Sequence, residues 1–370
     1  MKVPFIDFSA IAPDVRAAWA TSLNSVLDSG IFIGGRYVSE FEDTWSRKYC
    51  SGRAVVGVGN GFDALSIALR TLGIGKGHQV AVPAHTFIAT WTAVIEVGAT
   101  PVGVDVLRSG QMDLDELFEM NPRPDAVIPV HMHGLTVEMG RLMEWSEKYG
   151  VTVLEDCSQA HGMTSDGKPV GTWGQAGAFS FYPIKNLGAL GDAGAIVFDD
   201  SQLAANARKI ANYGANEANK YFHECFGKNS RLDPLQAAVL AVNERHLAEW
   251  NKRRAEIAQF YISELRSIRA LELLCTEIDK SVWHHFVVLS KSRDEFRMRL
   301  KEKGISTEIH YPLSAATEVA AFLPRSESIP QPTFPQATEL ASHGFSLPMN
   351  PWLTQDQVEY VVEIIHSVTD

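Results

Sequence analysis

Short β-rich runs that alternate with helical patterns constrain the fold more than any other feature of this sequence. The runs are Ala54–Val58, Gln79–Val82, Pro101–Asp105, Ala126–Val130, Val151–Glu155, Ala176–Phe181 and Ala195–Phe198. Helical patterns with apolar residues three and four apart follow several of them, at Asp63–Leu72, Thr86–Val97 and Glu138–Tyr149. This alternation predicts an α/β fold with a seven-stranded, mostly parallel sheet covered by helices on both faces. The last two runs lie close together in the chain, so at least one antiparallel pairing is expected.

The rest of the sequence predicts a second, smaller unit. Asp233–Leu265 has the pattern of one long or broken helix that could link two domains. Beyond it we expect a strand at Trp283–Leu289 and a helix at Asp294–Lys303. A Pro-rich stretch follows at 324–335, and a terminal helix begins at Thr354. We therefore predict a large domain over residues 1–245 and a small C-terminal α/β domain over 246–370.

Composition and charge exclude several classes of partner. The 370 residues are 45% hydrophobic, enough for a substantial core, and the formal net charge is −11. No dense run of Lys and Arg could follow a phosphate backbone, so neither nucleic acid nor an anionic membrane is an expected partner. The segment Met1–Ala20 has no secretory pattern, and no apolar run approaches the roughly 20 residues that span a bilayer.

The cysteines and histidines do not suggest a metal centre. Four cysteines, Cys50, Cys157, Cys225 and Cys275, are scattered without metal-type spacing, which suits reduced thiols in a cytoplasm. His131 and His133 would point to opposite faces if their segment were extended. We predict a cytoplasmic protein without a metal site.

Chemistry is expected beyond the carboxyl ends of the parallel strands, where ligands bind in open α/β sheets. A glycine-rich turn, Gly57–Gly61, follows the first strand and enters a helix, where free amides suit a phosphate. Glycines at such a turn often serve only the turn. Asp156 follows the fifth strand, and a buried carboxylate there could keep a pyridine nitrogen protonated or could simply cap a helix.

A lysine follows the sixth strand. Lys185 lies in a glycine-rich loop, where a lysine can lose its proton and attack an aldehyde, although a lone loop lysine is usually a solvated charge. Ser180, five residues earlier, could reach the same phosphate as the glycine turn. Phe87, after the second strand, could lie on a flat cofactor or pack in the core. An Asp and a Lys at the ends of successive strands, with a phosphate-type turn upstream, favour the chemical interpretation.

Three segments together resemble the DegT/DnrJ/EryC1/StrS sugar aminotransferases: Glu155–Gly162, Phe179–Gly188 and Gly227–Asp233. The resemblance runs from about Pro4 to the end of the chain and is loosest between 312 and 335. It implies the aspartate-aminotransferase fold, type I among pyridoxal-phosphate enzymes. It also implies a homodimer whose active sites are shared between subunits.

The resemblance assigns cofactor contacts to Gly61, Phe62, Phe87, Asp156, Gln159, Ser180, Lys185 and Asn229. Lys185 matches the Schiff-base lysine, Asp156 the partner of the pyridine nitrogen and Gln159 a residue near the ring hydroxyl. Phe87 matches the stacking aromatic, and Asn229 an asparagine that reaches the phosphate in the neighbouring subunit. A related branch that dehydrates sugars has His at the lysine position, so Lys185 indicates transamination.

Two departures from the family pattern limit what the resemblance implies. Family members usually have Thr where Phe62 stands, so one hydroxyl contact to the phosphate is missing. The backbone amides of Gly61 and Phe62 must therefore contribute more of the phosphate binding. After Ile309–Pro312 the family typically has another His and a Gln-Pro pair, where this chain has Leu313–Thr317. Substrate contacts in that segment cannot be carried over.

The implied reaction moves an amino group from L-glutamate to a nucleotide-linked keto-sugar. The loop sequences look most like the branch that aminates C3 of dTDP-3-keto-6-deoxyhexoses, with the C4-aminating branch as the nearest alternative. Four residues could touch the sugar or nucleotide, or could be packing: Tyr182, Tyr213, His310 and Tyr311. A non-catalytic regulatory relative and a dinucleotide-binding dehydrogenase are alternatives from other classes, and the glycine turn lacks the spacing that the dehydrogenase needs.

Overall fold

The central sheet has seven strands, as predicted. The computed structural model describes residues 1–216, 219, 221–322 and 333–369. The strands of this sheet are β1 (Ala54–Val58), β2 (Gln79–Pro83), β3 (Thr100–Val104), β4 (Ala126–Val127), β5 (Thr152–Asp156), β8 (Ala176–Ser180) and β9 (Gly194–Phe198). Their spatial order is β1-β9-β8-β5-β4-β2-β3.

Strand β9 explains why the sheet is mostly rather than wholly parallel. The pairs β2/β3, β2/β4, β4/β5 and β5/β8 are parallel, whereas β9 runs antiparallel to both β1 and β8. The predicted antiparallel pairing of the last two runs is therefore confirmed. The carboxyl ends of β1, β2, β5 and β8 share one edge of the sheet, and the residues that follow these ends build the site.

Side chains alternate between two buried faces along each strand. Val56 and Leu154 belong to the core beneath α3 (Gly61–Thr71), α4 (Ile88–Glu96) and α7 (Ser201–Ala211). Val55 and Val153 face the opposite cores, which α2, α5, α6 and α8 cover. The bounds of these covering helices are Arg36–Tyr49, Leu114–Glu119, Met139–Tyr149 and Pro234–Asn243. Burial on both faces is what the near-continuous apolar strands predict.

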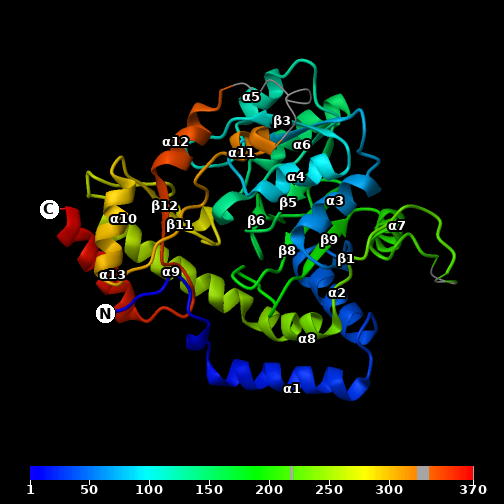
Figure 1. The fold of residues 1–370 in the computed structure, drawn as a ribbon, viewed down its shortest axis with the longest axis horizontal. Coiled ribbons are helices and arrows are strands. Elements are labelled where there is room, and N and C mark those ends of the chain that lie inside the picture. Colours follow the sequence, from blue (N-terminus) through cyan, green and yellow to red (C-terminus); the bar gives the residue numbers. More distant parts are fainter. Residues whose placement is uncertain (217–218, 220, 323–332, 370) are drawn as a thin grey trace.

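The C-terminal part has its own small sheet, in the order β10-β11-β12 (Glu272–Leu273, Phe286–Leu289, Gly344–Leu347). Its core is built with α9 (Leu247–Leu265), α10 (Arg293–Glu302) and α13 (Gln355–Thr369). Helices α11 (Ala315–Phe322) and α12 (Pro335–His343) return toward the large sheet, and α1 (Pro13–Ser29) runs alongside α8. Figure 1 shows both termini beside these C-terminal elements.

Short elements complete the described chain. One two-stranded hairpin pairs β6 (Thr164–Ser165) with β7 (Lys168–Pro169). Four 3₁₀ helices are described: η1 (Phe8–Ala10), η2 (Met132–Gly134), η3 (Glu244–His246) and η4 (Ile278–Lys280). In the described ranges no helix combines the length and apolar character needed to cross a bilayer.

The predicted long helix is broken. Between Asp233 and Leu265 the chain forms α8, the 3₁₀ turn η3 and then α9. The domain boundary near residue 245 falls within this break and stays a prediction, since Val3 from the N-terminus also packs in the C-terminal core. The Pro-rich stretch at 324–335 falls mostly outside the described residues. The condition attached to His131 and His133 is not met: their segment is not extended, because it turns into η2 with His133 at a φ of 61°.

Candidate active site

The start of α3 presents unpaired amides next to the end of β8. Asn60 caps the helix, its side chain accepting a hydrogen bond from the Asp63 amide at 2.8 Å. Within the described ranges no acceptor is recorded for the amides of Gly61 and Phe62. A Cβ on Gly61 would lie only 2.6 Å from the Ser180 Cβ, so glycine alone allows this approach. Two amides and one hydroxyl thus lie together, a set that suits a phosphate.

Phe62 contributes only its backbone to this set. Its ring packs partly buried against the core, with the Lys228 ammonium 5.4 Å from the ring centroid. The hydroxyl that the resemblance led us to expect at this position is replaced by a side chain engaged elsewhere. The anion site therefore depends on the helix amides and Ser180.

Asp156 ends β5 with its carboxylate fixed but not saturated. The Thr90 hydroxyl donates to Oδ2 at 3.0 Å, and the Ser158 amide donates to Oδ1 at 3.1 Å. No helix begins at the residues after Asp156 in the described chain, so the helix-cap alternative does not apply. Each carboxylate oxygen keeps acceptor capacity for a further donor.

Lys185 lies in the turn after β8, where its amide donates to the Tyr182 carbonyl at 2.9 Å. Burial lowers the pKa of its ammonium to about 8, while the negative charge of Asp156 acts in the opposite direction. In the described part of the chain the amine has no recorded hydrogen bond or ion pair. The uncharged, nucleophilic form of this lysine is therefore more populated near neutral pH than that of an exposed lysine.

One wall of the site joins four residues singled out from the sequence. Phe87, at the start of α4, is 54% exposed, and its ring centroid lies 5.4 Å from that of Tyr311. Gln159 donates to the Tyr311 hydroxyl at 3.2 Å and accepts from the His133 amide at 2.6 Å. His310 is anchored through Nδ1 to the Ser346 hydroxyl at 2.9 Å. The exposed face of Phe87 is available to a flat ligand.

Tyr182 is half-exposed beside Lys185, whereas two other predicted residues lie in a different segment. The Tyr213 amide donates to the Lys228 carbonyl, and Asn229 bridges to Asn212. The next residue, Ser230, accepts from the Gly59 amide at 3.0 Å, so this segment runs beside the glycine turn of its own chain.

Sequence reasoning missed a group of buried residues around these positions. They are Thr90, His85, His133, His284, His285, Asn186 and Arg254. Thr90 lies one turn of α4 after Thr86, and the two hydroxyls are 3.1 Å apart, so the helical spacing was a usable signal. The histidines come from separate segments and converge only through tertiary packing: the His133 and His285 Nδ1 atoms are 3.2 Å apart, and the rings of His285 and His310 stack at 3.8 Å.

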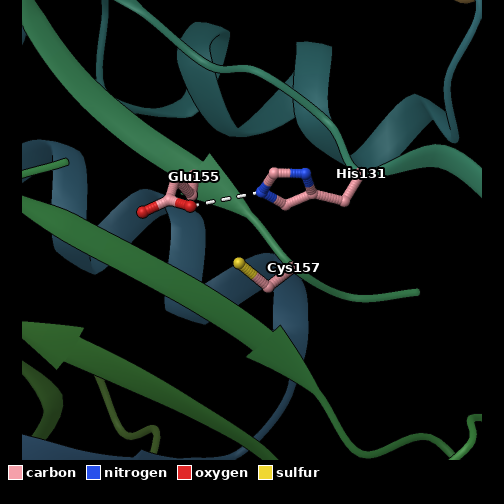
Figure 2. A group of neighbouring side chains, drawn as sticks. All are labelled: His131, Glu155 and Cys157. Carbon is pink, nitrogen blue, oxygen red and sulfur yellow. Dashed lines mark hydrogen bonds and ion pairs between the residues drawn. The ribbon is translucent and has the colours of Figure 1, made fainter. Parts of the chain in front are cut away.

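A second cluster could be mistaken for a metal centre. Figure 2 shows His131, Glu155 and Cys157 side by side, with ligand atoms within 4.8 Å of one another. The Val137 amide donates to His131 Nδ1, so Nε2 carries the hydrogen and donates to Glu155 at 3.2 Å. Burial, with the nearby charge of Glu155, raises the pKa of the Cys157 thiol well above its usual value. As placed, neither nitrogen nor sulfur offers a free ligand, and the cluster is structural.

The residues at the strand ends fit pyridoxal phosphate. The amides at the start of α3 and the Ser180 hydroxyl match a phosphate, Asp156 matches a protonated ring nitrogen, and Lys185 matches an aldehyde. A seven-stranded α/β sheet carrying this set defines the fold and site of a type I pyridoxal-phosphate enzyme.

The family follows from comparison with known proteins. The model of the DegT/DnrJ/EryC1/StrS aminotransferase family matches residues 13–366, and the chain belongs to this family. It is an aminotransferase, and its cofactor is pyridoxal phosphate, as predicted.

Individual relatives agree over the whole length. The chain is 40% identical over 370 residues to the dTDP-3-amino-3,4,6-trideoxy-alpha-D-glucose transaminase of Streptomyces venezuelae, covering 99% of this chain and 96% of the relative. It is similar to the crystal structure of S. venezuelae DesV in complex with a ketimine intermediate (TM-score 0.92, 39% identity, 100% and 99% of the two chains). It is also similar to the structure of NtdA from Bacillus subtilis with bound cofactor PMP (TM-score 0.91, 29% identity, 100% and 85%).

Proposed function

We propose that this chain transfers the amino group of L-glutamate to C3 of a dTDP-linked 3-keto-6-deoxyhexose. The observation that carries the proposal is the placement of Lys185 and Asp156 in one site, where the carboxylate acts on the pKa of the lysine. The position of the new amino group is inferred from the 40% identical relative, whose name places it on carbon 3. Glutamate as donor follows from the family resemblance.

Each residue of the site has a defined task in this proposal. When bound, pyridoxal phosphate supplies an electron-withdrawing ring and an aldehyde that exchanges amino groups. The amides of Gly61 and Phe62, with Ser180, hold the phosphate. Asp156, fixed by Thr90 and Ser158, keeps a negative charge beside the ring nitrogen. Lys185 Nζ anchors the cofactor and, once released, carries a proton as a base.

The substrate wall is proposed from exposure and position. Tyr182 and Phe87 are half-exposed around Lys185, and Tyr311 and His310 lie beside Phe87 and Gln159. Hydroxyl and imidazole groups there suit the hydroxyls and diphosphate of a nucleotide sugar. Tyr213 lies in the same segment as Asn229, and we propose that it acts at the partner subunit's site together with Asn229 rather than beside Lys185 of its own chain.

We also propose that the enzyme works in the cytoplasm as a homodimer with shared sites. The segment before Asn229 exposes large aromatic side chains, with Tyr221 at 81% and Phe226 at 95%. Apolar exposure of this size favours an interface. Mixing chains that carry Lys185→Ala with chains that carry Asn229→Ala tests this arrangement. If Asn229 serves the partner's site, the mixed dimer has one intact site and activity returns; no recovery overturns the sharing.

A panel of 3-keto and 4-keto nucleotide sugars tests the substrate. Glutamate-dependent amination of the 3-keto compounds is expected, with the position of the new C–N bond read by NMR. Amination of 4-keto sugars alone would replace the proposal with the C4 alternative. Cofactor colour that glutamate does not bleach, with no product from any sugar, would favour a regulatory role. Lys185→Ala is the control and should show neither aldimine absorbance nor turnover.

A further inference from the structure

The segment that carries Asn229 is tied to the glycine turn of its own chain on both sides of this residue. On one side, the Ser230 hydroxyl accepts a hydrogen bond from the Gly59 amide at 3.0 Å, and Ser230 is 2% exposed. On the other side, the Lys228 ammonium lies 2.5 Å from Asp63 Oδ1. Gly59 and Asp63 flank the start of α3, whose amides suit the cofactor phosphate. Asn229 is therefore held between two contacts to the phosphate turn, while its own side chain is exposed.

Lys228 joins α3 to the end of α4 through its ammonium. Beside Asp63, the ammonium contacts Glu96 Oε1 at 2.7 Å and lies 5.4 Å from the centre of the Phe62 ring. The second carboxylate oxygen of Asp63 accepts a hydrogen bond from the Asn60 side chain at 3.1 Å. Burial by itself would lower the pKa of Lys228, but the hydrogen bonds with Asp63 and Glu96 raise it above its usual value. Lys228 is thus a fixed positive charge with two carboxylates as partners.

Partial burial makes this ion network stronger than an exposed pair. The side chains of Lys228, Asp63 and Glu96 are 24%, 13% and 27% exposed, so water screens their charges less than at the open surface. The Lys228 amide donates to the Ile210 carbonyl at 2.8 Å, which ties the backbone to the end of α7 as well. Side chain and backbone of Lys228 together join three helices, α3, α4 and α7.

We propose that Lys228 and Ser230 are positioning residues, which hold Asn229 in place for the cofactor phosphate of the partner subunit. This role rests on the proposed function, because it requires that the two subunits share their sites. Without the two contacts, the backbone alone would have to hold an exposed side chain in a productive position. The Phe62 ring belongs to the same arrangement. The residue that removes one hydroxyl from the phosphate site therefore adds a contact to the segment that carries Asn229.

A mixed dimer separates the site that Lys228 serves from the site of its own chain. One chain keeps Lys185, and the other carries Lys185→Ala together with the substitution to be tested. Two different affinity tags isolate the mixed dimer. Only the chain with Lys185 gives visible aldimine absorbance, so a cofactor titration reports on one site. The Asn229 of that site comes from the chain that carries the test substitution.

The substitutions should change cofactor binding at the reporting site in a defined order. Lys228→Met should raise the dissociation constant about 5-fold, because one hydrogen bond to a charged phosphate is displaced. Ser230→Ala should raise it about 2-fold, since it removes a single neutral hydrogen bond. Lys228→Arg keeps the charge and should restore most of the affinity. Lys48→Met is the control: it removes an ion pair with Glu244, at 2.9 Å between α2 and η3, and should leave the dissociation constant unchanged.

Adding Asn229→Ala to the test chain shows whether Lys228 acts through Asn229. Once the Asn229 side chain is absent, Lys228→Met should cause no further loss, because residues that act as one unit are not additive. An unchanged dissociation constant in Lys228→Met, or an equal loss with and without Asn229, would overturn the proposal and leave the shared site in place. No effect of Asn229→Ala itself would remove the shared site, and with it the task proposed for Lys228.

Hydrogen exchange in the cofactor-free dimer tests the two contacts without any ligand. The Lys228 and Ser230 amides donate to the carbonyls at the end of α7, and mass spectrometry of their peptide reports how often these bonds open. Exchange should be about 5-fold faster in Lys228→Met and unchanged in Lys48→Met. Ser230→Ala gives the same test in a chain whose ion network is intact. Wild-type exchange rates in both Lys228→Met and Ser230→Ala would show that these side chains do not hold the segment, and the proposal would fail.

Discussion

Two neighbouring carboxylates on β5 show how one strand serves structure and chemistry at once. Glu155 and Asp156 point to opposite faces of the sheet, because side chains alternate along a strand. Glu155 is fully buried, and its carboxylate accepts from three backbone amides and from His131. Asp156, at the edge of the strand, accepts from one hydroxyl and one amide.

The two carboxylates differ in how much of their hydrogen-bond acceptor capacity remains unused. Four hydrogen bonds from the protein occupy the acceptor capacity of the Glu155 carboxylate. Three of them come from the amides of Gly171, Trp173 and Gly174, so this side chain fixes the turn before β8. Asp156 is oriented by two donors and keeps acceptor capacity toward Lys185 and the site. Saturation thus marks the structural carboxylate, and incomplete saturation marks the functional one.

Asp156→Ala is the change with the largest expected effect on activity. Removing a charge placed to stabilise the ring nitrogen should lower kcat about 10³-fold, by analogy with the loss of a strong electrostatic contact in other enzymes. The melting temperature should fall less than in Glu155→Gln, because this buried side chain accepts two protein hydrogen bonds where Glu155 accepts four. Steady-state kinetics at saturating cofactor, together with thermal unfolding, check both expectations. Near-normal turnover would break the comparison, since Asp156 would then be as structural as Glu155.

Glu155→Gln should show the opposite pattern. A glutamine side chain has one acceptor oxygen and one amide nitrogen, so at least one of the surrounding N–H donors is left buried and unpaired. The free energy of unfolding should fall by about 3 kcal/mol. The chains that remain folded should keep kcat within a few-fold of the wild-type value. Chemical denaturation measures the first quantity, and activity per bound cofactor measures the second.

The pH dependence of cofactor incorporation separates the two carboxylates further. Burial lowers the pKa of Lys185 to about 8, and Asp156 opposes this shift. The rate at which cofactor-free enzyme takes up pyridoxal phosphate should therefore rise with pH and level off above about 8, as the neutral amine becomes dominant. Stopped-flow absorbance measures this profile.

The variants should move this profile differently. In Asp156→Ala the midpoint should fall, because the charge that favours the ammonium is gone. In Glu155→Gln it should stay, since Glu155 does not contribute to the shift of Lys185. A midpoint near the value of an exposed lysine would show that Lys185 is not buried.

The fold was largely predictable because the strands carry local signals. All seven runs are strands, and most bounds agree within one residue. The fourth is shorter than predicted, since Pro129 has no amide to continue the ladder. Helix α1 was missed because only Val15 and Val26 are buried along it, so it has no apolar stripe to detect.

The site was predictable only where residues follow strands. Asp156, Ser180 and Lys185 were found because sheet topology brings strand ends together. The buried histidines His85, His133, His284 and His285 were not, since their positions depend on how distant segments pack. The predicted strand Trp283–Leu289 in fact begins at Phe286, and Trp283 has a φ of 51°, so His284 and His285 precede the ladder and face the site. No periodicity in the sequence reports such a turn.

Thr90 offers the finest test of the comparison, because it changes how Asp156 is held without changing its charge. Thr90→Val removes the donor to Asp156 Oδ2 and conserves the shape of the side chain. One hydrogen bond to a charged group is lost, and the freed oxygen can find another donor, so kcat should fall about 3- to 10-fold. Thr90→Ser keeps the hydroxyl and should retain most of the activity. Equal losses in both variants would assign the effect to packing of α4, and then a single donor would not distinguish the functional carboxylate from its neighbour.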